Sequence, residues 1–220
     1  LCLAKGHFLQ DWHYHPHHPP LGGRLITYRP QFSRVSTVRD ALSQNHAIFA
    51  RHSVRASNLF MQSLAQHLRA VAEAVVTQLQ AISDEQASAK PLPEKWSKKE
   101  ILGHLIDSAC NNHQKFVRAM AQPDLRFAGY QQDFWVETQH YNQADWTGLV
   151  ALWQAYNRHL AHVVEHAKPE MLQNTISIEE AGPFTLSFVM EDYVEHLKHH
   201  LKQILPNADL NSKFQNIYNA

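Results

Sequence analysis

Residues 97–110 have the sequence SKKEILGHLIDSAC. Its first four residues form a capping box, in which the Ser97 hydroxyl and the Glu100 carboxylate can each bind a backbone amide at a helix start. The apolar residues that follow recur at helical spacing. They are Ile101 or Leu102, Leu105, Ala109, Phe116 and Met120. We therefore predict a helix from about Lys98 to about Met120.

Three more segments carry apolar residues at spacings of three and four, which is typical of amphipathic helices. They cover residues 61–82, about 145–167 and about 187–205. A long loop of residues 122–144, rich in aromatic side chains, precedes the third helix. Residues 174–186 alternate weakly, as a short hairpin would. Four helices with one long crossover connection predict an all-α four-helix bundle.

The first 60 residues differ in composition from the rest of the chain. They carry 7 basic and 2 acidic residues, a net charge of +5, whereas residues 61–220 carry 13 and 18, a net charge of −5. Prolines and glycines interrupt them, and they show no sustained helical or strand period, so we expect them to be irregular. Their histidine tract, His15 to His18, could bind metal, and their arginine-rich, acid-poor composition partly fits a transit peptide. Both interpretations stay open.

The boundary between the two compositions falls before Met61. The chain begins with Leu1, and Met61 opens the first amphipathic helix. We therefore expect residues 1–60 to be a disordered or non-native leader. Residues 61–210 are expected to form the bundle, and residues 211–220 a C-terminal tail.

The composition of the whole chain argues against several classes of partner. The chain has 20 lysine and arginine residues and 20 aspartate and glutamate residues, so its net charge is zero. It therefore lacks the net positive charge that would favour binding to nucleic acid or to an anionic membrane. No apolar run reaches the roughly 18–20 residues that span a bilayer. Two cysteines are too few for a disulfide scaffold. We expect a cytoplasmic protein, and its 17 histidines are its most unusual feature.

Two histidines of the last predicted helix are spaced to bind one metal ion. His196 and His200 lie four residues apart, so both imidazoles project from one face and can reach an ion at about 2.0–2.1 Å. His104 borders the apolar stripe of another helix and is a candidate third ligand. Three imidazoles and an open position would suit catalytic zinc, and imidazole also binds nickel and iron. His196 with His199 is an alternative pair, and surface histidines beside a core stripe are the structural alternative.

A second group of histidines falls on one face of the third predicted helix. His159, His162 and His166 are spaced by three and four residues. We expect them to be solvated or to stack against other rings, but a function for this face stays open.

Two motifs resemble those of the DinB/YfiT-like superfamily. Residues 96–108, WSKKEILGHLIDS, resemble its second-helix motif. Residues 196–204, HLKHHLKQI, resemble its closing motif, in which two histidines four residues apart complete a metal site. The resemblance covers about residues 61–210 and implies an up-down-down-up four-helix bundle.

The resemblance also implies a site and a class of chemistry. The implied ligands of a divalent ion (zinc, nickel or iron) are His104, His196 and His200, which sets His199 aside. Members of the family include candidate metal-dependent hydrolases and transferases that use low-molecular-weight thiols such as bacillithiol or mycothiol, and many are homodimers. We therefore expect a hydrolase or a thiol-dependent transferase acting on a small molecule. The competing hypothesis is a non-catalytic, stress-associated metal-binding or dimeric interaction protein.

Two carboxylates could assist such an ion. Asp107 lies one turn after His104 and is the candidate catalytic residue, as a general base or as a group that orients a ligand imidazole. Asp192 precedes His196 by four residues and could also orient it. A carboxylate on the helix surface is the structural alternative for Asp107.

The candidate substrate-binding residues are Asn111, Tyr130 and Trp135. Asn111 lies one turn after Asp107, and the two aromatic residues belong to the long loop, which we expect to fold over one end of the bundle. Aromatic loops also form satellite cores, and this alternative stays open. Cys110 is expected to be a small buried thiol rather than a nucleophile.

Overall fold

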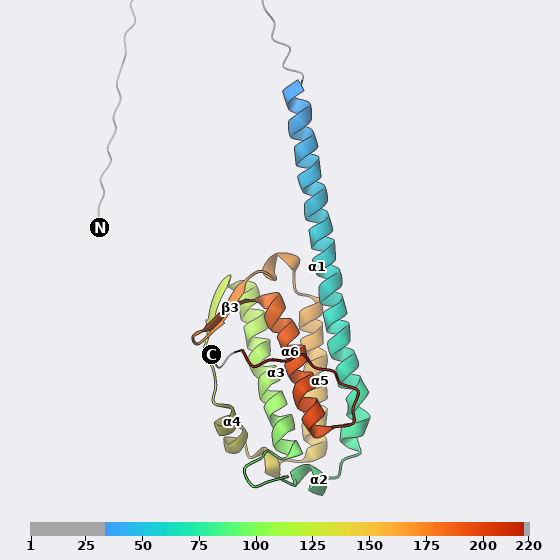
Figure 1. Ribbon diagram of the computed structural model, residues 1–220, viewed down its shortest axis with the longest axis vertical. Coiled ribbons are helices and arrows are strands. Elements are labelled where there is room, and N and C mark those ends of the chain that lie inside the picture. The colour runs from blue at the N-terminus through green and yellow to red at the C-terminus, as the bar shows by residue number, and fades with distance from the viewer. Residues whose placement is uncertain (1–33, 218–220) are drawn as a thin grey trace, which may run out of the picture. The chain divides into compact units, whose positions relative to one another are not determined.

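The computed structural model describes the backbone of residues 34–217 and the side chains of residues 48 and 50–217. In the compact unit that begins at Asn45, four long helices make the predicted bundle (Figure 1). These helices are α1 (Arg34–Gln80), which contributes its C-terminal part, α3 (Lys98–Ala121), α5 (Trp146–Glu165) and α6 (Leu186–Ile204).

Helix α1 begins at Arg34, well before the predicted start at Met61. Between residues 48 and 60, the described side chains are exposed apart from half-buried Ser57. A helical segment without a packed face needs no apolar stripe, so the sequence pattern detects this helix only from Met61 onward. The segment expected to be irregular is therefore helical from Arg34. Residues 1–33, with the histidine tract, lie outside the described residues, and the leader assignment stays a prediction.

Short elements occupy the connections between the long helices. They are α2 (Asp84–Ser88), α4 (Gln132–Thr138) and the 3-10 turns η1 (Tyr141–Gln143) and η2 (Pro169–Met171). The predicted aromatic loop of residues 122–144 therefore contains the short helix α4 and the turn η1.

The directions of the long helices follow from the ends that meet. Trp146 Nε1, at the start of α5, donates to the carbonyl oxygen of Leu79, at the end of α1, over 2.9 Å. Lys98 Nζ, at the start of α3, donates to the carbonyl oxygen of Ile204, at the end of α6, over 2.7 Å. Asp84 contacts both Lys99, at the start of α3, and the Trp146 amide, at the start of α5. Helices α3 and α5 therefore run in one direction, and α6 and the bundled part of α1 in the other. This is the up-down-down-up order that the resemblance implies.

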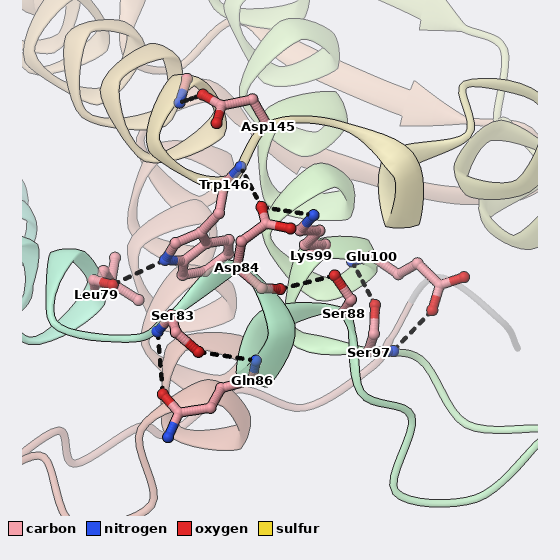
Figure 2. A network of polar contacts seen from close by, with 11 residues as sticks. Leu79, Ser83, Asp84, Gln86, Ser88, Ser97, Lys99, Glu100, Asp145 and Trp146 are labelled. Carbon is pink, nitrogen blue, oxygen red and sulfur yellow. Dashed lines mark hydrogen bonds and ion pairs between the residues drawn. The ribbon is translucent and has the colours of Figure 1, made fainter.

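Figure 2 shows the polar network that fixes this end of the bundle. Asp84 Oδ1 pairs with the buried Lys99 Nζ over 2.8 Å and also accepts from the Trp146 amide over 3.2 Å. The predicted capping box is confirmed. Ser97 Oγ accepts from the Glu100 amide over 3.2 Å, and Glu100 Oε2 accepts from the Ser97 amide over 2.7 Å. The start of α3 is therefore tied to α2 and α5.

A three-stranded sheet lies near the other end of α3. Strand β1 (Asp124–Phe127) pairs in parallel with β2 (Thr175–Ile178), which pairs antiparallel with β3 (Ala181–Thr185). Strands β2 and β3 confirm the predicted hairpin of residues 174–186. Strand β1 was not predicted, because four residues are too few to show a period of two and its partner is distant in sequence.

Candidate metal centre

Helices α3 and α6 pack side by side and bring His104, His196 and His200 together. One ring nitrogen of each lies within 4.8 Å of the others. The Nε2 atoms of His104 and His196 are 3.3 Å apart, and the three ring centroids are separated by 4.5 to 5.2 Å. His104 is far from His196 and His200 in the sequence, and the three histidines nevertheless form one cluster.

Burial keeps these three imidazoles neutral. His104 is 1% exposed, and burial, with a smaller effect from His200, lowers its pKa to about 3. Burial likewise lowers the pKa of His200 to about 4 and that of His196 well below its ordinary value. A neutral imidazole keeps a lone pair for a metal ion at neutral pH. The cluster therefore has the protonation state that metal binding requires.

The partners of the other ring nitrogens suit the same role. His200 Nδ1 lies 3.2 Å from Gln203 Oε1, to which it can donate, and this leaves Nε2 as the nitrogen with the lone pair. His196 Nδ1 lies 3.4 Å from Ser108 Oγ. His104 Nδ1 is buried and has no hydrogen-bond partner among the described residues. Three neutral imidazoles, two of them with a partner at Nδ1, are a donor set that fits zinc, nickel or iron.

A cavity of about 280 Å³ opens beside the cluster. His196 and His200 contribute to its wall, together with Ser108, Lys115 and Tyr130. Among the described residues, no fourth histidine, cysteine or carboxylate belongs to the cluster. An ion held by the three imidazoles would thus face a space of the size of a small molecule.

His199 lies outside the cluster although it lines the same cavity. Its Nε2 is 3.1 Å from Gln203 Nε2, and its ring lies 5.5 Å from that of Phe214. Phe214 belongs to the segment after α6, and its ring also lies 4.9 Å from the His196 ring. The described part of the predicted tail therefore covers one side of the histidines.

Asp107 is buried and does not contribute to the wall of the cavity. Its Oδ1 accepts from the Tyr141 hydroxyl over 2.8 Å and from Gln139 Nε2 over 2.9 Å. Its Oδ2 is buried without a partner among the described residues, and burial raises the pKa of this carboxyl. The contacts of Asp107 tie α3 to the segment after α4.

Gly103 allows this close approach. A Cβ atom at Gly103 would overlap the ring of Tyr141, so only glycine lets that ring lie directly on α3. The Tyr141 hydroxyl can then reach Asp107. The Gly-His pair in the helix motif thus combines a packing residue with a candidate ligand.

The three predicted substrate-binding residues lie in different places. Tyr130 lines the cavity, and its ring lies 4.9 Å from that of Trp135, which supports it from outside the wall. Asn111 is buried and donates from Nδ2 to the backbone oxygen of Asp107 over 2.9 Å. Only Tyr130 of the three contributes to the wall of the cavity.

Sequence reasoning missed Lys115, which also lines the cavity. Its Nζ lies 5.5 Å from the Phe127 ring centroid, and burial lowers its pKa to about 8, although the charge of Asp192 opposes this shift. A signal for it was present, because His104, Ser108 and Lys115 are spaced by four and seven residues on one helical face. The face of α3 that carries His104 therefore also carries the charged side chain of Lys115.

Comparisons with known proteins identify the family and the fold. The sequence profile of the DinB superfamily matches residues 65–204. A curated relative from Bacillus mycoides, named a "putative metal-dependent hydrolase", is 24% identical over 50% of this chain and 62% of its own length. One from Oceanobacillus iheyensis with the same kind of name is 23% identical over 56% of this chain and 71% of its own. The chain thus spans about three fifths of the first relative and seven tenths of the second.

A solved structure shows the same fold. YfiT from Bacillus subtilis, described as "a probable metal-dependent hydrolase with an unusual four-helix bundle topology", superimposes with a TM-score of 0.61. It is 20% identical, and the match covers 66% of this chain and 84% of YfiT.

Within residues 34–217, no helix is both long enough and apolar enough to cross a membrane.

Proposed function

The chain belongs to the DinB superfamily, and on that basis we propose that it is a metal-dependent hydrolase of a small molecule, with His104, His196 and His200 as the metal ligands. The observation that carries this proposal is the convergence of three neutral imidazoles beside a cavity of about 280 Å³. The names of the two curated relatives support the same class of reaction.

The bound ion would act as a Lewis acid that polarises the bond to be hydrolysed and makes water a better nucleophile near neutral pH. The protein would supply the orientation. Gln203 and Ser108 restrain two of the imidazoles. Lys115 places a positive charge at the cavity, where it would bind an anionic group of the substrate or stabilise negative charge that develops during the reaction.

Asp107 fits a positioning role in this scheme. It holds the hydroxyl of Tyr141 and the amide of Gln139, and so fixes the segment that follows Tyr130 and α4. A role for Asp107 as a general base stays a prediction. Tyr130, which lines the cavity and contacts Trp135, is the aromatic residue placed to contact a substrate.

The finer predictions stay proposals within this one. The open side of the cluster would also accept the sulfur of a low-molecular-weight thiol, because a divalent metal favours the thiolate form. Zinc, nickel and iron are equally compatible with three imidazoles. A homodimer and a cytoplasmic location are expectations from the resemblance and the composition. The non-catalytic binding protein is the competing proposal, and a fourth protein ligand on the bound ion would favour it.

The first test is metal content, measured by elemental analysis on the full chain and on two variants. His200→Ala should lose about one ion per chain, whereas His199→Ala, which changes a neighbouring histidine outside the cluster, should lose none. Histidines elsewhere are common to all three proteins, so the difference isolates the cluster. An equal metal content in all three proteins would contradict the proposed site.

The second test is turnover. Chains loaded with zinc, nickel or iron should hydrolyse members of a panel of small esters and amides, and the His200→Ala variant should not. If a thiol such as cysteine is instead consumed together with an electrophilic substrate, the reaction is a transfer. If the ion is bound but neither reaction occurs, the non-catalytic alternative leads.

A further inference from the structure

We propose that the C-terminal end of α5 carries a second metal site, formed by His162 and Glu165 in the last turn and by the C-cap residue His166, which binds a divalent first-row ion such as Zn²⁺. One ligand atom of each of these residues lies within 4.8 Å of the others. None of the three lines the cavity beside the first cluster. The site is therefore separate from the proposed hydrolytic centre.

The two histidines have the geometry of a chelating pair. They lie four residues apart, His162 in α5 and His166 at its C-cap. Both are exposed, and their ring centroids are 4.2 Å apart. His166 Nδ1 lies 2.8 Å from the backbone oxygen of His162, to which it donates. This hydrogen bond fixes the ring and leaves Nε2 with its lone pair, which is how histidine ligands are commonly oriented in metal sites.

Glu165 supplies the third donor. Its Oε2 accepts from Arg69 Nη2 over 2.5 Å. The ion pair takes one carboxylate oxygen and leaves Oε1 for a metal. Arg69 comes from α1, so an ion bound here would join a contact that already links two helices.

The donor set defines the class of ion. Two imidazoles and one carboxylate are ligands of zinc and of non-haem iron, and they leave other coordination positions open. The site lies at the end of α5, where the helix dipole favours a cation. The positive charge of Arg69 acts against the ion. The affinity should therefore depend on Arg69 as well as on the ligands.

The test is a Zn²⁺ titration of the full chain against a chromophoric chelator. His162→Ala/His166→Ala should bind about one ion fewer per chain and keep any hydrolytic activity of the first cluster. Glu165→Gln should weaken binding at this site by at least about tenfold. Arg69→Gln should strengthen it, because the repulsive charge is gone.

His159→Ala is the matched control, since His159 is exposed on the same helix but pairs with the ring of His113. It should leave the titration unchanged. The proposal is overturned if the double variant binds as many ions as the parent chain, or if His159→Ala loses as much binding as the double variant. An unchanged affinity in Glu165→Gln would also overturn the three-ligand site. Circular dichroism of each variant shows whether the fold is retained.

Discussion

Lowering the pH should destabilise the metal-free protein, because the clustered histidines are held neutral in the folded chain. The pKa values of His104 and His200 are about 3 and about 4, lowered chiefly by burial from the ordinary 6.5. Once the pH falls below 6.5, the unfolded chain binds a proton at each of these imidazoles and the folded chain does not. Stability is therefore lost as the pH falls from about 6.5 towards the folded pKa values.

The size of the effect follows from proton linkage. Between pH 7 and pH 5, each of these two histidines should lower the free energy of unfolding by about 2 kcal/mol, or about 4 kcal/mol together. His196, whose pKa is also lowered by burial, acts in the same direction. This is a large part of the roughly 5–15 kcal/mol that stabilises a typical domain.

Urea unfolding of the full chain with a chelator present, followed by circular dichroism at pH 5, 6 and 7, measures this loss. In His200→Asn, the difference in unfolding free energy between pH 7 and pH 5 should shrink by about 2 kcal/mol. His199→Asn, a change at an exposed neighbour, is the control and should keep the full difference. Carboxylates titrate alike in all three proteins. An unchanged pH dependence in His200→Asn would refute the buried, neutral cluster.

Three other substitutions test separate contacts. Gly103→Ala places a methyl group against the ring of Tyr141 and should lower the free energy of unfolding by about 1–3 kcal/mol in urea; no change would show that the ring can move aside. Trp146→Phe removes the donor to the Leu79 oxygen and should cost about 1–3 kcal/mol in the same assay. Lys115→Met should lower kcat/KM for an anionic ester by about tenfold or more and spare a neutral ester, and equal losses for both would mean that its charge is not used.

Much of the bundle could be predicted because the apolar residues that recur at helical spacing are the ones that pack in its core. The capping box at Ser97 and Glu100 marked the start of α3. The apolar spacing of residues 145–167 predicted α5 to within a few residues of its observed ends. The start of α1 could not be predicted in the same way, because the described residues before Met61 are largely exposed and nothing selects an apolar face there. The spacing of apolar residues shows which part of a helix is packed, and a helix can extend beyond that part.

The candidate site was only partly predictable for a related reason. The spacing of His196 and His200 shows that they share a face, but it does not show which residue of another helix meets them. His104 was a candidate because it borders the apolar stripe of another helix, and the family resemblance implied that it completes the set. Lys115 was missed because a lysine on a helix usually points to solvent, and only the packing of α3 against α6 places it at the cavity.

The two histidine clusters differ in the sequence distance that each spans. His104 and His196 are 92 positions apart, so an ion can join them only after α6 has packed against α3, and its binding free energy then counts toward the whole fold. His162, Glu165 and His166 fall within five consecutive residues, in the last turn of α5 and its C-cap. That turn could capture an ion as soon as it forms during synthesis, before the bundle closes. Ion binding at the cluster of His104 would thus require the folded bundle, whereas ion binding at the cluster of His162 would require only the end of α5.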